Sequence, residues 1–398
     1  MNTPKLSRRR LLISAVAAPL AVGLAQLSVA ATASGDGARF VFVVLRGGMD
    51  GLGAVPAVGD PAFAAARGPL AQFGAPALAL DGTFALHPNL SQLHAMFERG
   101  DAAVIHAVGL PYRERSHFDA QQLLESGGTK PYELQTGWLG RALASTGARG
   151  VAINTAVPLV LRGSEQIDSW APSTLPEPSA DLVARLQHLY RGDPALGQAL
   201  ARARDLRSQP TMTEGMMAPG VNRVAAVALA RKATELLLRP GGSTVAVLEL
   251  GGWDTHANQA APQGALANNL RTLDAVLATL HDGLAALEAQ GAWARTVIVV
   301  ASEFGREVAV NGTMGTDHGT GGAAFVLGGA VKGGRVLTDW PGLAPTQRFE
   351  GRDLRITTDL RAVLRPLLAQ HLGVSRNALN GSVFPGTAGL RGVELLRG

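Results

Sequence analysis

The chain has 398 residues, of which 17% are charged, and a formal net charge of +5. Four of its positive charges, Lys5 and Arg8 to Arg10, lie near the N-terminus, so the rest of the chain is close to neutral and its charge does not indicate nucleic-acid binding. The chain contains no cysteine, which excludes disulfides, a thiolate zinc site, a cysteine nucleophile and a formylglycine made from cysteine.

Residues 1–33 predict a cleaved export signal. Arg8 to Arg10 lie in S-R-R-R-L-L, a sequence of the twin-arginine type, and the apolar run Leu11 to Leu24 follows. This run is too short to span a membrane and contains Pro19, so we expect cleavage after Ala30 or Ala33. The mature protein would then have no stable membrane span and would be periplasmic or secreted, after delivery by the twin-arginine export machinery.

The first predicted strand of the mature chain, Phe40 to Leu45, ends in R-G-G-M-D-G-L. Glycines allow a sharp turn there and present Asp50 at the edge of the predicted sheet. An ordinary turn in which Asp50 is a cap is the alternative interpretation. Next come a helix over Asn89 to Arg99 and a strand over Ala102 to Val108, with His106 expected in the core and His87 at the surface.

The segment R-E-R-S-H-F-D precedes a predicted helix. Ser116, with Asp119 three residues later, fits a helix N-cap. The same position also suits a nucleophile, because free N–H groups at a helix N-terminus attract a phosphate or sulfate oxygen. Both interpretations of Ser116 stay open.

Shorter elements and an insertion follow in the middle of the chain. The pattern predicts a helix over Thr136 to Thr146 and short strands over Val151 to Asn154 and Leu159 to Leu161. Residues 162–242 then become rich in Pro and Ser and read as several helices, Ala180 to Tyr190 being the first. We expect this segment to be a helical cap inserted between strands of the sheet.

Two strand patterns each lead into acidic and histidine side chains. Val245 to Leu250 and Thr296 to Val300 are strand-like, and the helical pattern Ala260 to Gln290 between them makes the two strands parallel. Ligands of parallel sheets bind beyond the carboxyl ends of the strands, so the two clusters should form one site. Carboxylates with histidines favour a divalent metal, zinc or manganese rather than magnesium or calcium. The residues that follow the two strands are Asp254, His256, Glu303, Arg306, Asp317 and His318.

The last part of the chain predicts a strand, a turn and a helix. Ala323 to Leu327 enters G-G-A-V-K-G-G, which suggests a hairpin or a glycine-rich turn near the sheet edge, with Arg335 to Leu337 as the strand's candidate partner. A final helix over Thr358 to His371 ends the predicted domain, residues 38–375, and residues 376–398 are expected to be a C-terminal tail.

Seven motifs together resemble one family: L-R-G-G-M-D-G-L, S-H-F-D-A-Q, G-W-L-G-R, G-G-W-D-T-H, S-E-F-G-R, T-D-H-G-T-G-G and G-G-A-V-K-G-G. They are similar to the exported bacterial family called domain of unknown function 1501, which is placed in the alkaline phosphatase and sulfatase superfamily. The resemblance covers about residues 38–375. It implies an alkaline-phosphatase-like three-layer α/β sandwich with a mostly parallel central sheet and a helical insertion. It also implies metal-dependent hydrolysis of phosphate or sulfate esters on an anionic small-molecule or polymer substrate.

The resemblance implies roles for particular residues. The superfamily has an aspartate ligand after its first strand, which corresponds to Asp50, and Arg46 and Arg306 would assist in binding the anion. Its nucleophile lies at a helix start, and counting back from the glycine that ends this helix places that position nearer His117 than Ser116. The implied metal ligands are therefore Asp50, Asp254, His256, Glu303, Asp317 and His318.

One departure from the superfamily supports an alternative function. Phe304 stands where the superfamily typically has a histidine, and phenylalanine cannot bind a metal. The alternative is a non-catalytic envelope protein that uses a degenerate hydrolase fold to bind a glycan, a polymer or a protein partner.

Overall fold

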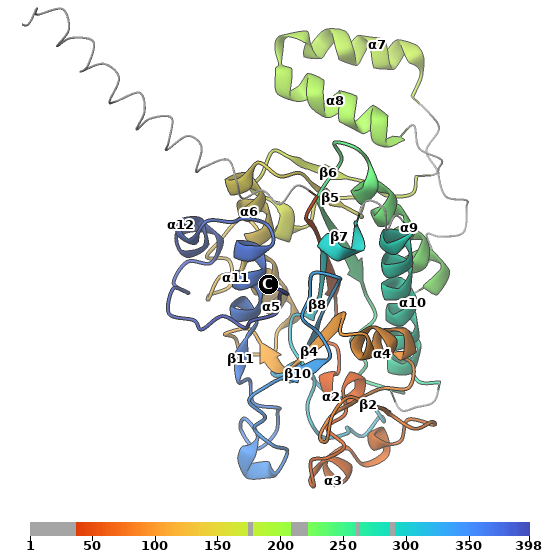
Figure 1. Cartoon of the computed structure of the whole chain (residues 1–398), viewed down its shortest axis with the longest axis vertical. Helices are drawn as coiled ribbons and strands as arrows, with labels where there is room; N and C mark the ends of the chain where they lie inside the picture. The colour runs from red at the N-terminus through yellow and green to blue at the C-terminus, as the bar shows by residue number, and fades with distance from the viewer. Residues whose placement is uncertain (1–36, 174–177, 208–221, 260–262, 287–290) are drawn as a thin grey trace, which may run out of the picture. The chain divides into compact units, whose positions relative to one another are not determined.

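A nine-stranded sheet forms the centre of the structure, a computed structural model that describes residues 37–173, 178–207, 222–259, 263–286 and 291–398 (Figure 1). The export signal expected over residues 1–33 lies outside these ranges. Residues Gly37 to Gly398 pack as one unit. Among the helices that the structure describes, none is long and apolar enough to cross a membrane.

The sheet is mixed but mostly parallel, with strand order β10-β4-β9-β8-β1-β7-β5-β6 and β11 also paired with β4. β9 is antiparallel to both of its neighbours, β4 and β8, whereas the other recorded pairings in this sheet are parallel. A separate two-stranded sheet pairs Leu78–Ala79 (β2) with Ala85–Leu86 (β3). The strands of the large sheet are β1 (Arg39–Leu45), β4 (Ala102–Gly109), β5 (Gly150–Ala152), β6 (Ile167–Ser169), β7 (Val245–Leu250), β8 (Thr296–Ser302), β9 (Gly322–Leu327), β10 (Arg335–Leu337) and β11 (Thr358–Asp359).

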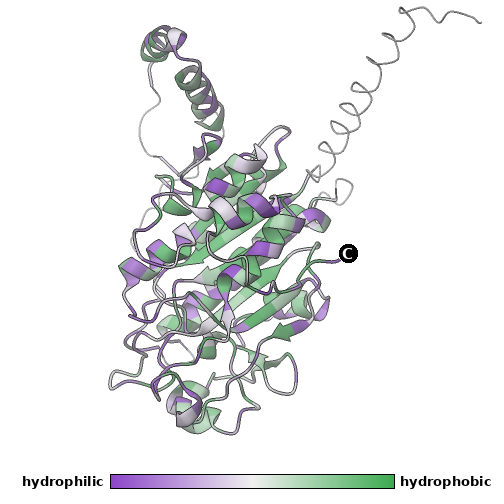
Figure 2. Ribbon diagram, turned by 90° about the vertical axis from the view of Figure 1, so that its left-hand side faces the viewer, coloured by the Kyte–Doolittle hydropathy of each residue, from purple (hydrophilic) through white to green (hydrophobic). Residues whose placement is uncertain are grey.

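Both faces of the sheet are buried, because strand side chains alternate between two hydrophobic cores. Within β1, Val41 and Val43 belong to one core and Phe40 and Phe42 to the other. Helices α4, α9 and α10 pack on the first face and α5, α6 and α11 on the second (Figure 1). In Figure 2 the strands of the sheet are coloured mainly as hydrophobic. The predicted three-layer α/β sandwich with a mostly parallel central sheet is therefore confirmed. The helices are α2 (Gly51–Ala54), α3 (Phe63–Arg67), α4 (Ser91–Glu98), α5 (His117–Ser126), α6 (Trp138–Thr146), α7 (Ala180–Leu189), α8 (Pro194–Arg207), α9 (Arg223–Leu238), α10 (Ala265–Ala285), α11 (Leu360–Gln370) and α12 (Arg376–Ala378).

One predicted strand and one predicted strand pairing are wrong. Leu159–Leu161 is a 3-10 helix and not a strand. Its carbonyl groups lie close to Gly137, just before α6, and to Gly140, within α6, instead of pairing with a strand. Arg335–Leu337 pairs in parallel with β4 and not with β9, because both edges of β9 are already occupied by β4 and β8. β9 consequently lies inside the sheet and not at its edge.

The placement of two histidines tests the expected core. His106 is fully buried, as predicted, and its Nε2 lies 2.9 Å from the carbonyl oxygen of Val55. His87 was expected at the surface, but only 3% of it is exposed. Its Nδ1 accepts a hydrogen bond of 3.1 Å from the backbone N–H of Asn89, which gives a buried polar group a partner.

The helical insertion divides into two kinds of element. β6 adds a strand to the sheet and α9 packs into the core, with Ala230 and Ala233 fully buried. In contrast, α7 has no buried residue. α8 is connected to the sheet by an ion pair of 2.8 Å between its Arg202 and Asp168 of β6.

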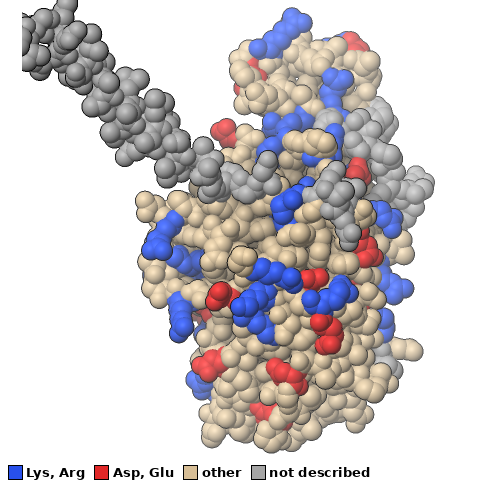
Figure 3. All heavy atoms as spheres, in the orientation of Figure 1, with Lys and Arg blue, Asp and Glu red and all other residues tan. Residues whose placement is uncertain are grey.

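On the face drawn in Figure 3, basic and acidic side chains are interspersed.

The segment expected to be a C-terminal tail is packed against the second core. α12 leads into a π-helical turn, Leu379–Val383, in which both named end residues are buried. The Phe384 ring that follows stacks on Trp138 of α6 at a centroid distance of 5.6 Å. Residues 376–384 therefore form part of the sandwich.

Candidate metal centre

Three strands end at the same level of the sheet and deliver their loops to one place. Leu45, the last residue of β1, pairs with Leu250 of β7 on one side and with Ser302 of β8 on the other. The loops that follow β1, β7 and β8 therefore start side by side, at the carboxyl edge where ligands of parallel sheets bind. The start of α5 and the loop before β9 also reach this edge.

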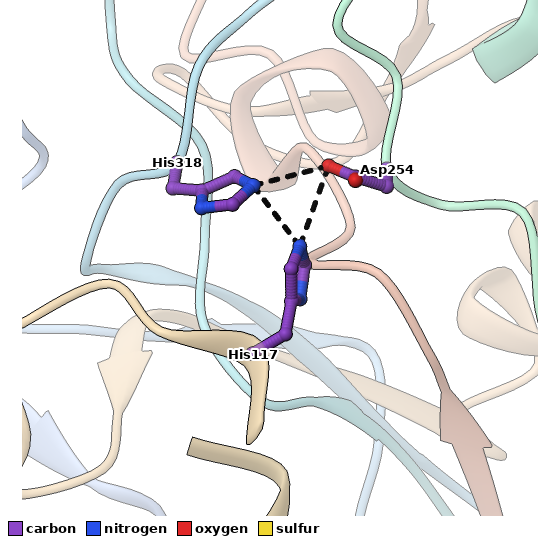
Figure 4. Close-up of side chains that lie close together, drawn as sticks. All are labelled: His117, Asp254 and His318. Atoms are coloured by element: carbon purple, nitrogen blue, oxygen red, sulfur yellow. Dashed lines mark hydrogen bonds and ion pairs between the residues drawn. The ribbon is translucent and has the colours of Figure 1, made fainter. Parts of the chain in front are cut away.

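Three side chains from different loops converge there (Figure 4). The Nε2 atoms of His117 and His318 lie 3.0 Å apart, and the Oδ1 atom of Asp254 lies 3.4 Å from the first and 3.2 Å from the second. His117 begins α5, Asp254 follows β7 and His318 precedes β9. The predicted convergence of Asp254 and His318 is confirmed.

A fourth side chain, His256, lies against the same group. Its Nε2 is 2.9 Å from His318 Nε2 and 3.0 Å from Asp254 Oδ1. Five of the pairwise distances among these four atoms thus lie between 2.9 and 3.4 Å. A tetrahedral zinc site with Zn–N distances of about 2.0–2.1 Å places its ligand atoms about 3.3 Å apart.

The other nitrogen of each ring has an acceptor, which fixes the tautomer. Nδ1 of His117 lies 2.8 Å from Glu303 Oε1, and Nδ1 of His256 lies 2.9 Å from Asp317 Oδ1. Nδ1 of His318 lies 2.9 Å from the carbonyl oxygen of Arg115. In each neutral ring Nδ1 therefore carries the proton and Nε2 presents a lone pair, the arrangement found in histidines that bind metals.

When the three rings are neutral, each of these four atoms presents a lone pair, and not a proton, to its neighbours in the group. This arrangement is repulsive unless a cation lies among the donors, and imidazole with carboxylate is a donor set that zinc and manganese accept. The residues present therefore fit a divalent metal. They are His117, Asp254, His256 and His318.

The charge on Asp254 is held by an arginine. Burial would raise the pKa of the Asp254 carboxyl, but its hydrogen bond with Arg306 and the nearby positive charges outweigh burial and hold that pKa below its usual value. Arg306 Nη1 donates to Asp254 Oδ1 at 2.7 Å, and its side chain is fully buried. Asp254 is consequently a carboxylate over the pH range in which the protein would work.

Glu303 is connected to the metal group through His117. Its Oε1 accepts hydrogen bonds from Gly47 N–H at 2.8 Å and from Gln121 Nε2 at 3.1 Å, as well as facing His117. Burial opposes ionisation, but these hydrogen bonds lower the pKa of Glu303, and the hydrogen bond with Glu303 raises the pKa of His117. Glu303 therefore positions His117, whereas the sequence had suggested a ligand.

Asp50, also expected to be a ligand, lies outside this group. Its Oδ2 accepts hydrogen bonds from Arg67 and Gln259, and its Oδ1 accepts one from Gly53 N–H at 3.1 Å as the N-cap of α2. The carboxylate is buried with its own arginine, which satisfies its charge. The cap interpretation of Asp50 is the one that the structure shows.

The two arginines expected to bind an anion are both paired within the protein. Arg46 Nη2 donates to Glu249 at 2.5 Å and to Glu125 at 2.8 Å. Arg306 is bonded to Asp254 and to the carbonyl oxygen of Thr316. Each guanidinium thus balances a carboxylate at the sheet edge.

Ser116 and Phe304 border the centre. Ser116 occupies the N-cap position of α5, but its side chain makes no capping hydrogen bond, unlike the predicted capping box. The centroid of the Phe304 ring lies 4.7 Å from that of His117 and 5.2 Å from that of His318, so Phe304 packs against both imidazole rings. Phenylalanine itself cannot bind a metal.

Sequence reasoning considered His117 as a nucleophile and missed it as a ligand. Its signal was a histidine at the first position of a helix that follows a strand of the same sheet, a position comparable to those of the other candidate ligands. Asp317 was expected to bind the metal, but it orients His256 and is itself held by Asn311 Nδ2 at 3.1 Å.

The family model described as "Protein of unknown function (DUF1501)" matches residues 76–378. The chain belongs to this family. No curated protein matches the sequence of this DUF1501 chain.

Several solved structures resemble the DUF1501 chain at low identity. The C-terminal periplasmic domain of EcEptC from Escherichia coli, in complex with Zn, is 13% identical and matches with a TM-score of 0.40 over 74% of each chain. Phosphonate monoester hydrolase of Agrobacterium radiobacter is 14% identical, with a TM-score of 0.41 over 85% of this chain and 74% of its own. PsFucS1 sulfatase from Pseudoalteromonas sp. is 12% identical, with a TM-score of 0.40 over 94% of this chain and 74% of its own.

Proposed function

We propose that this protein is an exported, metal-dependent hydrolase of phosphate or sulfate esters. The observation that carries the proposal is the group formed by His117, Asp254 and His318, with His256 beside Asp254 and His318, in which imidazole and carboxylate atoms lie 2.9–3.4 Å apart. A divalent ion bound there would polarise an ester oxygen and lower the pKa of a water toward 7. The twin-arginine-type leader supports export, and the three imidazoles favour zinc or manganese.

The charges around the centre support one divalent ion. Asp254, Glu303 and Asp317 each have a lowered pKa and are therefore ionised near neutral pH. Together with Arg306, they leave a net charge of two negative units, which a single divalent ion neutralises. A second divalent ion would lack a carboxylate partner among these residues.

The protein's own side chains prepare the site in three ways. Glu303 and Asp317 orient His117 and His256, so little reorganisation is needed when a ligand binds. Arg306 keeps Asp254 ionised. Phe304 packs against two of the rings and limits their rotation.

Metal analysis followed by an ester screen tests the proposal. Protein purified without chelators is expected to contain about one zinc or manganese ion per chain, and to hydrolyse 4-nitrophenyl phosphate or 4-nitrophenyl sulfate. Asp254→Asn and His318→Ala should lose both the metal and the activity. His281→Gln, which changes a histidine of α10, is the matched control and should lose neither. Full metal content in the Asp254→Asn, His318→Ala double variant would contradict the proposal.

A second candidate function is a non-catalytic envelope protein that binds a glycan, a polymer or a protein partner. The pairing of Arg46 with two carboxylates and of Arg306 with Asp254 favours it, because neither guanidinium is then left for an anionic substrate. Stoichiometric metal without hydrolysis of either ester would select this candidate.

A further inference from the structure

A cleft of about 360 Å³ opens at the same edge of the sheet as the metal centre. Its volume is at the lower end of the range of small-molecule sites, about 300–1,000 Å³, so it has room for one ring-sized group. Its polar wall comes from the ends of β1, β5 and β7, and its apolar wall comes largely from the insertion. The polar residues are Arg46, Asn154, Thr155 and Glu249, and the apolar ones are Ile153, Ala171, Pro172, Ala225 and Leu229.

The cleft and the metal centre are built on the same two loops, those that follow β1 and β7. The carbonyl of Arg46, a cleft residue, accepts a hydrogen bond of 3.2 Å from the N–H of Trp253, the neighbour of Asp254. Gly47 itself donates its N–H to Glu303 at 2.8 Å. A Cβ atom at Gly47 would clash with the backbone nitrogen of Asp254, so the loops after β1 and β7 touch where the chain has no side chain.

The charged groups at the polar wall have an excess of negative charge when the buried Glu125, which contacts Arg46 but does not line the cleft, is counted. The single guanidinium of Arg46 is shared by Glu249 at 2.5 Å and Glu125 at 2.8 Å. Glu249 also accepts a hydrogen bond from Asn154 Nδ2 at 3.2 Å, which leaves both of its oxygens occupied. One positive and two negative side chains therefore disfavour an anion in this cleft, while Arg46, with 25% of its side chain exposed, can still donate hydrogen bonds to a neutral oxygen.

The opposite wall favours an apolar surface on the ligand. Ala225 and Leu229 lie one turn apart on α9, and Ala171 and Pro172 follow β6. Contact with apolar side chains stabilises a ring or alkyl surface of a ligand, because that surface is removed from water, but it stabilises a strongly hydrated group very little. The cleft thus combines one apolar wall with one hydrogen-bonding wall whose arginine is paired with two carboxylates.

We propose that this cleft binds the alcohol portion of the ester and that this portion is uncharged, with an apolar face. The inference rests on the proposed function and narrows its substrate class to phosphate or sulfate monoesters of neutral alcohols. The charged ester group lies at the metal centre, and the alcohol lies in the cleft next to it. The helical insertion gains a defined role, since it supplies the apolar wall.

Equilibrium binding of two small probes tests the proposal without requiring turnover. Ligand-observed NMR on the protein as purified should detect benzyl alcohol in the cleft, and benzoate should bind there about tenfold more weakly, a difference of about 1.4 kcal/mol. Binding in the cleft is defined as the fraction of the measured probe binding that is lost in the Leu229→Trp variant. Leu182→Trp, a matched change on exposed α7, should leave binding unchanged. Glu249→Gln should reduce the preference for the alcohol over benzoate, because it removes one of the two negative charges.

The outcomes separate the cleft from the chemistry. Benzyl alcohol binding that Leu229→Trp does not affect, or tighter binding of benzoate in the cleft, overturns the inference. If the protein hydrolyses esters but its binding of benzyl alcohol does not depend on Leu229, the proposed role of the cleft is refuted and the proposed hydrolase function stands. Binding of benzyl alcohol with no hydrolysis of any ester refutes the hydrolase and supports the preference of the cleft for neutral ligands.

Discussion

Glu303 should control the metal affinity of the centre without binding the metal. Glu303→Gln keeps an oxygen that can accept from His117 Nδ1 and from Gly47 N–H, but it removes the negative charge. Loss of an outer carboxylate of this kind typically weakens metal binding by about 10–100-fold. Since the hydrogen bonds can survive, we expect a loss of about tenfold, which corresponds to about 1.4 kcal/mol. Glu303→Ala also leaves the buried Gly47 N–H without its partner, so its loss should approach about 100-fold.

Competition with a chromophoric zinc chelator measures these affinities directly. Glu350→Gln is the matched control, because Glu350 forms an ion pair with Arg115 but its side chain is 58% exposed. An unchanged affinity in Glu303→Gln would refute the positioning role. Complete loss of the metal in Glu303→Gln would instead make Glu303 a direct ligand.

Three further predictions concern other parts of the chain. Burial lowers the pKa of His106 to about 4, so the folded state resists a proton that the unfolded state accepts below its pKa of about 6.5. The free energy of unfolding should therefore fall by about 2 kcal/mol more between pH 7 and pH 5 than it does in His106→Phe. Urea unfolding with chelator present measures this difference, and parallel pH profiles of the two proteins would disprove it. Ser116→Ala should cost less than about 0.5 kcal/mol of unfolding free energy, because the hydroxyl makes no capping bond, and a loss near 1 kcal/mol would show that it caps α5 in solution. Changing Arg8 and Arg9 to lysine should retain uncleaved protein in the cytoplasm, and normal delivery of the mature form would reject twin-arginine export.

The sequence was sufficient for the central strands and for the convergence of their loops. Val245 to Leu250 and Thr296 to Val300 are largely apolar runs that are buried on both faces except at Glu249, and such runs have few alternatives in an α/β chain. Their parallel direction then placed Asp254 and His318 together. This part of the prediction depends on local pattern and on the handedness of a crossover.

The errors arise where a long-range partner decides the outcome. Asp50 follows a strand as a ligand would, but Arg67 and Gln259 take its carboxylate, and no local signal shows them as partners. His117 resembled any histidine at a helix start until Glu303 was placed 2.8 Å from its Nδ1. Local patterns place a residue at the edge of a sheet, but they do not show which neighbour its side chain meets.

The separation of the ligands along the chain has a consequence for the biosynthesis of the protein. His117 and His318 are 201 positions apart, and the loop with His318 is synthesised after β1, β4, β7 and β8. The complete donor set therefore exists only when most of the sheet has assembled, so metal binding stabilises a late stage of folding. If the chain crosses the membrane already folded, the ion in its centre is chosen by the metals available in the cytoplasm. Growth medium and expression compartment should then change which metal is found in the purified protein.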